Sequence, residues 1–100
     1  MQLCVIDWSF KNAEDQLFAT NEFCEYFKKG KFYELVEGFE LKFIAHTPTK
    51  GSGTIIGKAE SLHSICNLLS AWRKIYDISF NIKPALSNEE LIELNSSKEF

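Results

Sequence analysis

Hydrophobic and polar positions along this 100-residue chain follow two different periods. Residues 39–47 and 78–84 alternate between apolar and polar side chains, and residues 3–10 are rich in β-branched and aromatic side chains. After a turn at 48–53, residues 54–59 are expected to form the second strand of a hairpin. Residues 13–29 and 62–76 instead place apolar side chains three or four positions apart. Alternation is typical of a half-buried strand and the longer period of an amphipathic helix. The pattern predicts the order strand, helix, strand, strand, helix, strand.

Capping signals mark where the predicted helices begin. Asn12 and Ser61 directly precede the two helical segments, and both residue types satisfy the free N–H groups at a helix start. Ser87 and Glu90 have the spacing of a capping box, which predicts a short third helix over Leu91 to Leu94.

This element order is that of the split βαβ, or ferredoxin-like, fold. We expect an α+β protein with a four-stranded antiparallel sheet in the order 4-1-3-2, two helices on one face and a short C-terminal helix. One domain should span 1–100, with its core in 3–86 and a C-terminal extension at 87–100. In the connector at 31–38, Phe32, Tyr33 and Leu35 should cover the edge of the sheet.

Two helices on one face leave the other face of the sheet, the open face, without a cover. Alternation in 39–47 turns Phe39, Leu41, Phe43 and Ala45 to the helices and Glu40, Lys42, Ile44 and His46 to the open face. The open face then has an apolar centre of Val5, Ile44 and Ile56 within a polar rim. Because such a patch is typical of a binding surface, we expect a second copy of the chain, a small ligand, or both to cover it.

The helical period also predicts which side chains the helices bury. The apolar stripe of the first helix should contain Leu17, Asn21, Cys24 and Phe27 or Lys28, and Phe18 and Phe23 should widen it. That of the second should contain Leu62, Ile65, Cys66, Leu69 and Trp72. Cys24 and Cys66 would then be buried and unreactive.

Composition and charge narrow the function further. The net charge is −3, whereas proteins that bind phosphates lean basic, so neither nucleic acid nor an anionic membrane is expected as a partner. The three cysteines are widely spaced and form no CxxC pair, which disfavours a disulfide framework or a zinc site and favours reduced thiols in the cytoplasm. No cofactor and no metal are expected.

Two glycine-rich segments resemble nucleotide-binding motifs but lack their essential features. Residues 51–58 have neither the four-residue gap between glycines nor the Ser or Thr after the lysine that a phosphate loop requires. Residues 50–57 share the glycines of the RNA-recognition motif, but Ser52, Thr54 and Gly57 stand where that motif has aromatic rings. Those rings stack bases, at roughly 1–3 kcal/mol each, so RNA binding is not expected.

His46 is the candidate acid–base group because it ends a strand on the expected open face. The antiparallel order places Asp7 nearer Lys58 and Asn81, so a pair between Asp7 and His46 is expected only across a dimer. Within one subunit, Asp7 and Lys58 should make a structural contact. A ligand on the open face would meet Ile44, His46, Ile56, Lys58 and Asn81.

Five short segments carry a resemblance to a known family: Trp8, Phe43-Ile44-Ala45-His46, Ser61-Leu62-His63, Ala71-Trp72 and Phe80-Asn81-Ile82-Lys83-Pro84. Over most of residues 1–86 the chain resembles a family of small uncharacterised proteins with a dimeric α/β-barrel fold, found in cyanobacteria and their viruses among other sources. The resemblance implies a homodimer whose sheets pack face to face around a cavity, with no known reaction. Asp7 stands where a His or another polar residue is expected in relatives, so no catalytic role transfers to it.

Two functions are compatible with these observations. The first is a non-enzymatic cytoplasmic protein that forms a homodimer or a higher homo-oligomer through the open face and holds a small molecule there. The second is a cofactor-independent dimeric-barrel enzyme, monooxygenase- or isomerase-like, that acts on a small aromatic or carbonyl compound. In the second, His46 and Asp7 of the partner subunit would serve as acid and base.

Overall fold

The computed structural model describes residues 1–29 and 37–96 and has the predicted order of elements. The elements are β1 (Gln2–Phe10), α1 (Ala13–Lys28), β2 (Phe39–Thr47), the 3-10 turn η2 (Pro48–Lys50), β3 (Ser52–Ala59), α2 (Leu62–Ile75), β4 (Ile78–Pro84) and α3 (Asn88–Ser96). The predicted edge cover by Phe32, Tyr33 and Leu35 lies outside the described residues.

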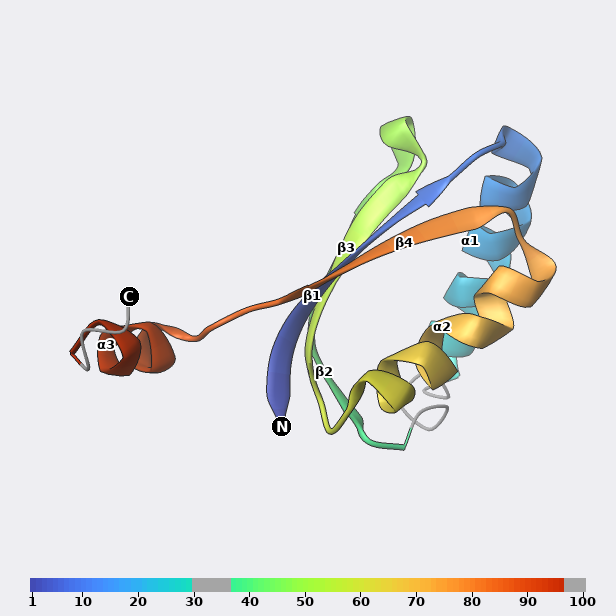
Figure 1. The fold of residues 1–100 in the computed structure, drawn as a ribbon. Helices are drawn as coiled ribbons and strands as arrows, with labels where there is room; N and C mark the ends of the chain where they lie inside the picture. Colours follow the sequence, from blue (N-terminus) through green and yellow to red (C-terminus); the bar gives the residue numbers. More distant parts are fainter. Residues whose placement is uncertain (30–36, 97–100) are drawn as a thin grey trace.

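The four strands form one antiparallel sheet in the order β2-β3-β1-β4, which confirms the predicted α+β, ferredoxin-like layout. α1 and α2 both lie on one face of this sheet (Figure 1). Of the helices in the described ranges, none combines the length and the apolarity needed to cross a bilayer.

The predicted caps are present at all three helix starts. The Asn12 side-chain oxygen accepts from the Asp15 N–H at 2.7 Å, and the Ser61 hydroxyl accepts from the Ser64 N–H at 3.2 Å. Ser87 and Glu90 form the capping box in both directions, at 3.0 and 3.2 Å. These local contacts satisfy N–H groups that the helices leave free, which explains why the helices begin here.

The hydrophobic core lies between α2 and the two central strands. Its fully buried side chains include Cys4 and Ile6 of β1, and Ile65, Leu68 and Leu69 of α2 pack over them. α1 contributes much less, since Ala19 is the one buried residue among its described positions.

The predicted inward stripes of both helices are wrong in part. Leu17 of α1 is 60% exposed, and Leu62 of α2 is 67% exposed. Cys24 and Cys66 are also exposed, so neither is a core thiol. The sheet contacts each helix along a stripe shifted from the most apolar one, because the docking angle rather than hydrophobicity alone selects the inward face.

A β-bulge in β2 overturns the predicted parity of that strand. Leu41 pairs with Gly57 but Phe43 pairs with Ile56, so Lys42 is an extra residue in the ladder. Because strand side chains alternate, one inserted residue moves every later side chain to the other face. Ile44 and His46 therefore face the helices, and Phe43 and Ala45 lie on the open face.

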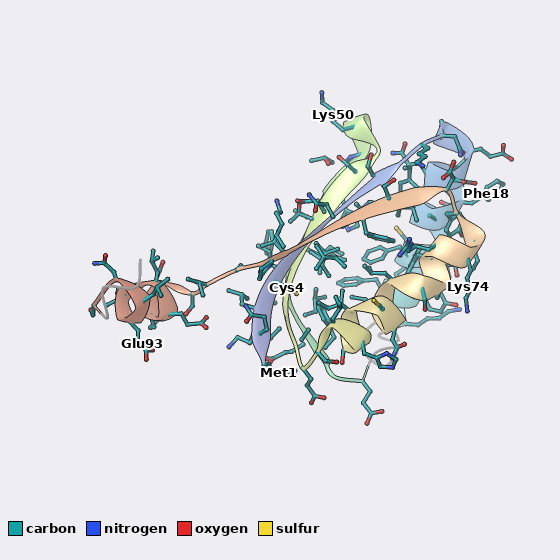
Figure 2. The ribbon with its side chains drawn as sticks, in the orientation of Figure 1. Met1, Cys4, Phe18, Lys50, Lys74 and Glu93 are labelled. Atoms are coloured by element: carbon teal, nitrogen blue, oxygen red, sulfur yellow. The ribbon has the colours of Figure 1, made fainter. Side chains whose placement is uncertain are left out.

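The C-terminal part of the chain leaves the body of the molecule as an extended arm. The Ala85 N–H donates to the Leu3 carbonyl at 2.9 Å, and beyond this contact α3 lies on the other side of the strands from α1 and α2 (Figure 1). Figure 2 shows Glu93 of α3 at the opposite end of the molecule from Phe18 of α1. The Cα radius of gyration is 15.1 Å. A compact domain of this length has about 13 Å, so the arm elongates the molecule.

Candidate functional site

A cavity of about 200 Å³ lies between the sheet and the two helices, at the end of the sheet where η2 joins β2 to β3. Five aromatic rings line it: Trp8 and Phe10 of β1, Phe23 of α1, Trp72 of α2 and Phe80 of β4. An apolar cavity of roughly 150 Å³ can hold benzene, and drug-sized ligands fill at least about 300 Å³. The space therefore suits a molecule of one or two rings.

α1 leaves this space open because, apart from Phe23, the side chains that it turns to the sheet are small or polar. The lining residues of α1 are Gln16, Ala19, Thr20, Phe23 and Cys24, which follow the i, i+3, i+4, i+7 spacing of one helix face. Ala19 is only 1% exposed, and its side chain is a single methyl group that leaves the cavity unfilled. A larger side chain at this position would extend into the cavity.

The indole of Trp8 forms part of the cavity wall because Gly53 lies beneath it. Trp8 and Gly53 are paired across β1 and β3, and a Cβ atom at Gly53 would overlap the indole ring. Gly57 likewise leaves room for the ring of Phe39, which would lie 2.5 Å from an added Cβ but does not line the cavity. A glycine within a strand indicates close approach of another group. This is the signal in the sequence that could have located the site.

His46 lies in the same wall, between two aromatic rings. Its ring centroid is 5.3 Å from that of Trp8 and 4.9 Å from that of Phe23, both in edge-on geometry. Although His46 as a residue is exposed, these contacts desolvate the imidazole and lower its pKa from the ordinary 6.5. A neutral imidazole offers one N–H donor and one acceptor nitrogen to a molecule in the cavity.

The lowered pKa of His46 predicts how stability changes with pH. The unfolded chain takes up the proton near pH 6.5, whereas the folded chain takes it up only at lower pH. The contribution of His46 to the free energy of unfolding is therefore complete above the pKa of the unfolded chain and is lost as the pH falls through the lower pKa of the folded chain. Urea unfolding from about pH 7.5 to about pH 5.5 should show a steeper loss for the wild type than for His46→Gln. Parallel curves would contradict this assignment.

Hydrogen bonds tie α1 to its neighbours around the cavity, and two of them come from long side chains. The Gln16 side-chain amide donates to the Pro48 carbonyl at 2.8 Å, and the Tyr76 hydroxyl donates to Glu22 at 2.5 Å. Burial and the Glu22 carboxylate raise the pKa of Tyr76 to about 12, so the phenol stays protonated and keeps this bond. The Tyr76 ring also contacts Trp72, at 5.9 Å between centroids, and so supports the cavity wall.

Asp7 lies on the open face and is engaged there in structural contacts. Its carboxylate accepts from the Thr54 hydroxyl at 2.6 Å and pairs with the Lys83 ammonium at 2.9 Å. These two interactions hold the pKa of Asp7 below its usual value, and the hydrogen bond from Thr54 has the larger effect. The expected contact with Lys58 is wrong, because the register places Lys58 opposite Leu3.

The expected pairing of Asp7 with His46 is not supported by the geometry. Asp7 is on the open face, and the bulge places His46 on the helix side of the same sheet. The structure therefore separates these two candidates within one subunit.

The predicted ligand-binding residues are divided between the two faces of the sheet. Ile44 and His46 line the cavity, and Ile56, Lys58 and Asn81 lie on the open face. The apolar centre of the open face is also altered, since Phe43 and Ala45 replace Ile44 beside Val5 and Ile56. We refer to Val5, Phe43, Ala45 and Ile56 as the Phe43 patch. Phe43 is 59% exposed, which is unusual for so large an apolar side chain in a sheet.

The fold and the cavity define a class of protein: an α+β domain of ferredoxin-like layout with a small aromatic-lined site between its sheet and its helices. Residues 2–99 match the model of a family described as a domain of unknown function (DUF3303), and the chain belongs to this family. Neither a curated protein nor a solved structure matches the chain. Since the family description assigns no activity, the function has to be argued from the site.

Proposed function

We propose that this protein binds a small molecule with one or two aromatic rings in the cavity between the sheet and the helices. The observation that carries the proposal is the lining itself, five aromatic rings around about 200 Å³. Stacked and edge-on aromatic contacts favour a flat ring beyond the burial of its area, by about 0.5–1.5 kcal/mol for each pair. Compared with a site between two sheets, as the sequence suggested, this position lies within one subunit.

A few polar groups in the wall would fix the orientation of such a ligand. His46, Thr20 and Gln16 line the cavity among the aromatic rings. A site of this composition, mostly apolar with a few directed polar groups, is typical of small-molecule recognition. A hydroxyl or carbonyl on the ring would find its partner at the neutral His46 imidazole.

Binding of 2-naphthol to the wild type, and to a variant whose cavity is filled by a larger side chain, tests the proposal. Both tryptophans of the chain line the cavity, so their fluorescence and indole N–H resonances report on binding there. We expect 2-naphthol to shift both resonances in the wild type. Ala19→Leu should weaken binding at least tenfold because the larger side chain occupies the cavity, at a stability cost of about 1–3 kcal/mol.

Ala71→Leu is the matched control, since Ala71 is an exposed position of α2. It adds the same atoms to a helix and should leave binding of 2-naphthol unchanged. Equal affinity in wild type and Ala19→Leu would contradict the proposed site.

We also propose that the protein is a homodimer whose sheets pack face to face through the Phe43 patch. The supporting observation is the exposure of Phe43 beside Val5 and Ile56, in a row across three strands. Exposed apolar patches with a polar rim mark interaction surfaces. A two-fold axis would pack the Phe43 patch of one chain on the Phe43 patch of the other, which closes the assembly as a dimer.

One observation favours a second candidate function, a cofactor-independent enzyme that moves a proton on a bicyclic carbonyl compound. His46 lies in the cavity wall with a lowered pKa, so it is neutral near pH 7 and able to accept a proton. The wild type should then speed hydrogen–deuterium exchange at the carbon beside the carbonyl of 2-tetralone, and His46→Gln should not. Exchange at the buffer rate in the wild type would remove this candidate and leave the binding proposal intact.

A further inference from the structure

We infer that α3 of each chain docks on a second copy of the chain, so that the homodimer exchanges its C-terminal arms. The arm is residues 85–96, which connect β4 to α3 and include it. The inference rests on the homodimer proposed above and adds to it a role for a segment that the cavity and the Phe43 patch leave unexplained.

α3 is too short to be stable as an isolated helix. It has nine residues, and isolated helices shorter than about 12–15 residues are marginal in water. None of its residues is buried against the rest of the described chain. The capping box of Ser87 and Glu90 nevertheless specifies a helix. A short helix that the sequence specifies and that the described part of its own chain leaves unburied would gain stability from another surface to pack on.

The arm presents apolar side chains that its own chain leaves uncovered. Leu86 is 48% exposed, Leu91 is 43% exposed and Ile92 is 65% exposed. Leu86 precedes the capping Ser87 and Leu91 follows it by four positions, which is the spacing of a hydrophobic staple. These three side chains are the surface that a partner would cover.

The direction of the arm places this surface where a second copy would lie. Two hydrogen bonds hold the start of the arm on the sheet. The Ala85 N–H donates to the Leu3 carbonyl at 2.9 Å, and the Gln2 side-chain amide donates to the Ala85 carbonyl at 3.0 Å. From this start α3 projects to the side of the strands away from α1 and α2 (Figure 1). A partner that packs on the open face therefore lies on the same side as α3.

The negative charge of α3 favours docking on the rim of the partner's open face, where lysines lie. α3 carries Glu89, Glu90 and Glu93 and no basic residue. The open face and its β2 edge carry three lysines, Lys42, Lys58 and Lys83, against the carboxylates of Asp7 and Glu40. Lys58 lies opposite Glu40 across β2 and β3, and it also attracts Glu90 of its own chain. Since the strands carry one more lysine than carboxylates on this face, its charge is complementary to that of the acidic helix.

Exchange between two copies satisfies both surfaces at once. Each chain offers one helix with exposed apolar side chains and one open face, and a two-fold axis pairs each helix with the other chain's face. The interface remains closed, so it gives a dimer and not a filament.

Hydrogen exchange of the full chain at two concentrations tests the inference. At about 100 μM we expect the α3 amides to exchange at least tenfold more slowly than at about 1 μM, because the helix is formed and covered only in the dimer. In sedimentation equilibrium, Leu91→Ser/Ile92→Ser should raise the dimer dissociation constant at least tenfold. Leu62→Ser, which changes a leucine of α2 that is about as exposed as Ile92, should leave it unchanged.

Each result decides between arm exchange and its alternatives. A dimer whose α3 exchanges equally fast at both concentrations would overturn arm exchange and leave the face-to-face dimer in place. A monomer with slow α3 exchange would mean that the arm folds back on its own chain, which overturns the inference. A monomer with fast α3 exchange would overturn both proposals.

Discussion

Gly53→Ala should abolish detectable binding of 2-naphthol and lower the free energy of unfolding by about 1–3 kcal/mol. An added Cβ at this position overlaps the Trp8 indole and comes within 2.6 Å of the Ala45 carbonyl oxygen. The backbone of a central strand cannot move away easily, so the indole has to shift toward the cavity that it lines. Chemical denaturation measures the stability, and the indole N–H resonances measure binding.

Gly57→Ala provides the matched control for this prediction. Its Cβ would meet the Phe39 ring at 2.5 Å and the Glu40 carbonyl oxygen at 2.6 Å, a similar conflict in the same strand. Phe39 does not line the cavity. We expect a comparable loss of stability with binding retained at a temperature where the variant is folded. Loss of binding in both variants would show that Gly53→Ala acts through general destabilisation.

Phe43→Glu should raise the dimer dissociation constant on the order of a hundredfold, which corresponds to about 2.7 kcal/mol. In the proposed dimer Phe43 is buried at the centre of two packed sheets, and a glutamate there would be desolvated beside its own copy. In one subunit Phe43 is 59% exposed, so the fold and the cavity should be unaffected. Sedimentation equilibrium measures the change, with circular dichroism and 2-naphthol binding as checks of the subunit.

Phe18→Glu is the control for surface phenylalanines in general. Phe18 lies on the outer side of α1 and is 56% exposed, almost the same fraction as Phe43. The dimer should tolerate the charge at this position. If both variants dissociate equally, or if neither does, the Phe43 patch is not the interface.

The two proposed surfaces serve different purposes although they share one sheet. The helix side of β1 and β3 holds Trp8 over Gly53 and forms the cavity, whereas the open side of the same strands holds the Asp7–Lys83 pair and the Phe43 patch. A mutation on one face can therefore be compared with one on the other without disturbing the same contacts. Sites with no shared partner usually contribute to stability additively.

The position of His46 shows most clearly where reasoning from the sequence stops. Alternation in 39–47 assigns faces correctly only if the ladder between β2 and β3 is unbroken, and Lys42 interrupts it. A bulge depends on how many residues each strand places between two hydrogen bonds, which is a property of the pair and not of either segment. The sequence marked His46 as a candidate but assigned it to the wrong face.

The cavity was equally hidden from the hydrophobic period. Leu17 and Phe18 are the larger apolar residues in the first half of α1, yet both are exposed, and the inward face carries Gln16, Ala19 and Thr20. Which stripe of a helix meets a sheet depends on the docking of the whole helix. Small and polar side chains facing a sheet are what make room for a ligand, and they weaken the signal that predicts a core.

The elements, their order and their caps at Asn12, Ser61 and Ser87 could be predicted from the sequence, because these features depend on contacts within a few residues. The general rules of chain topology then predicted the strand order. Which side chains share the cavity and which make the open face came from the tertiary structure, as did the finding that no residue of α3 is buried among the described residues. Each of these depends on the pairing or docking of segments far apart in the chain, where a shift of one residue exchanges inside for outside.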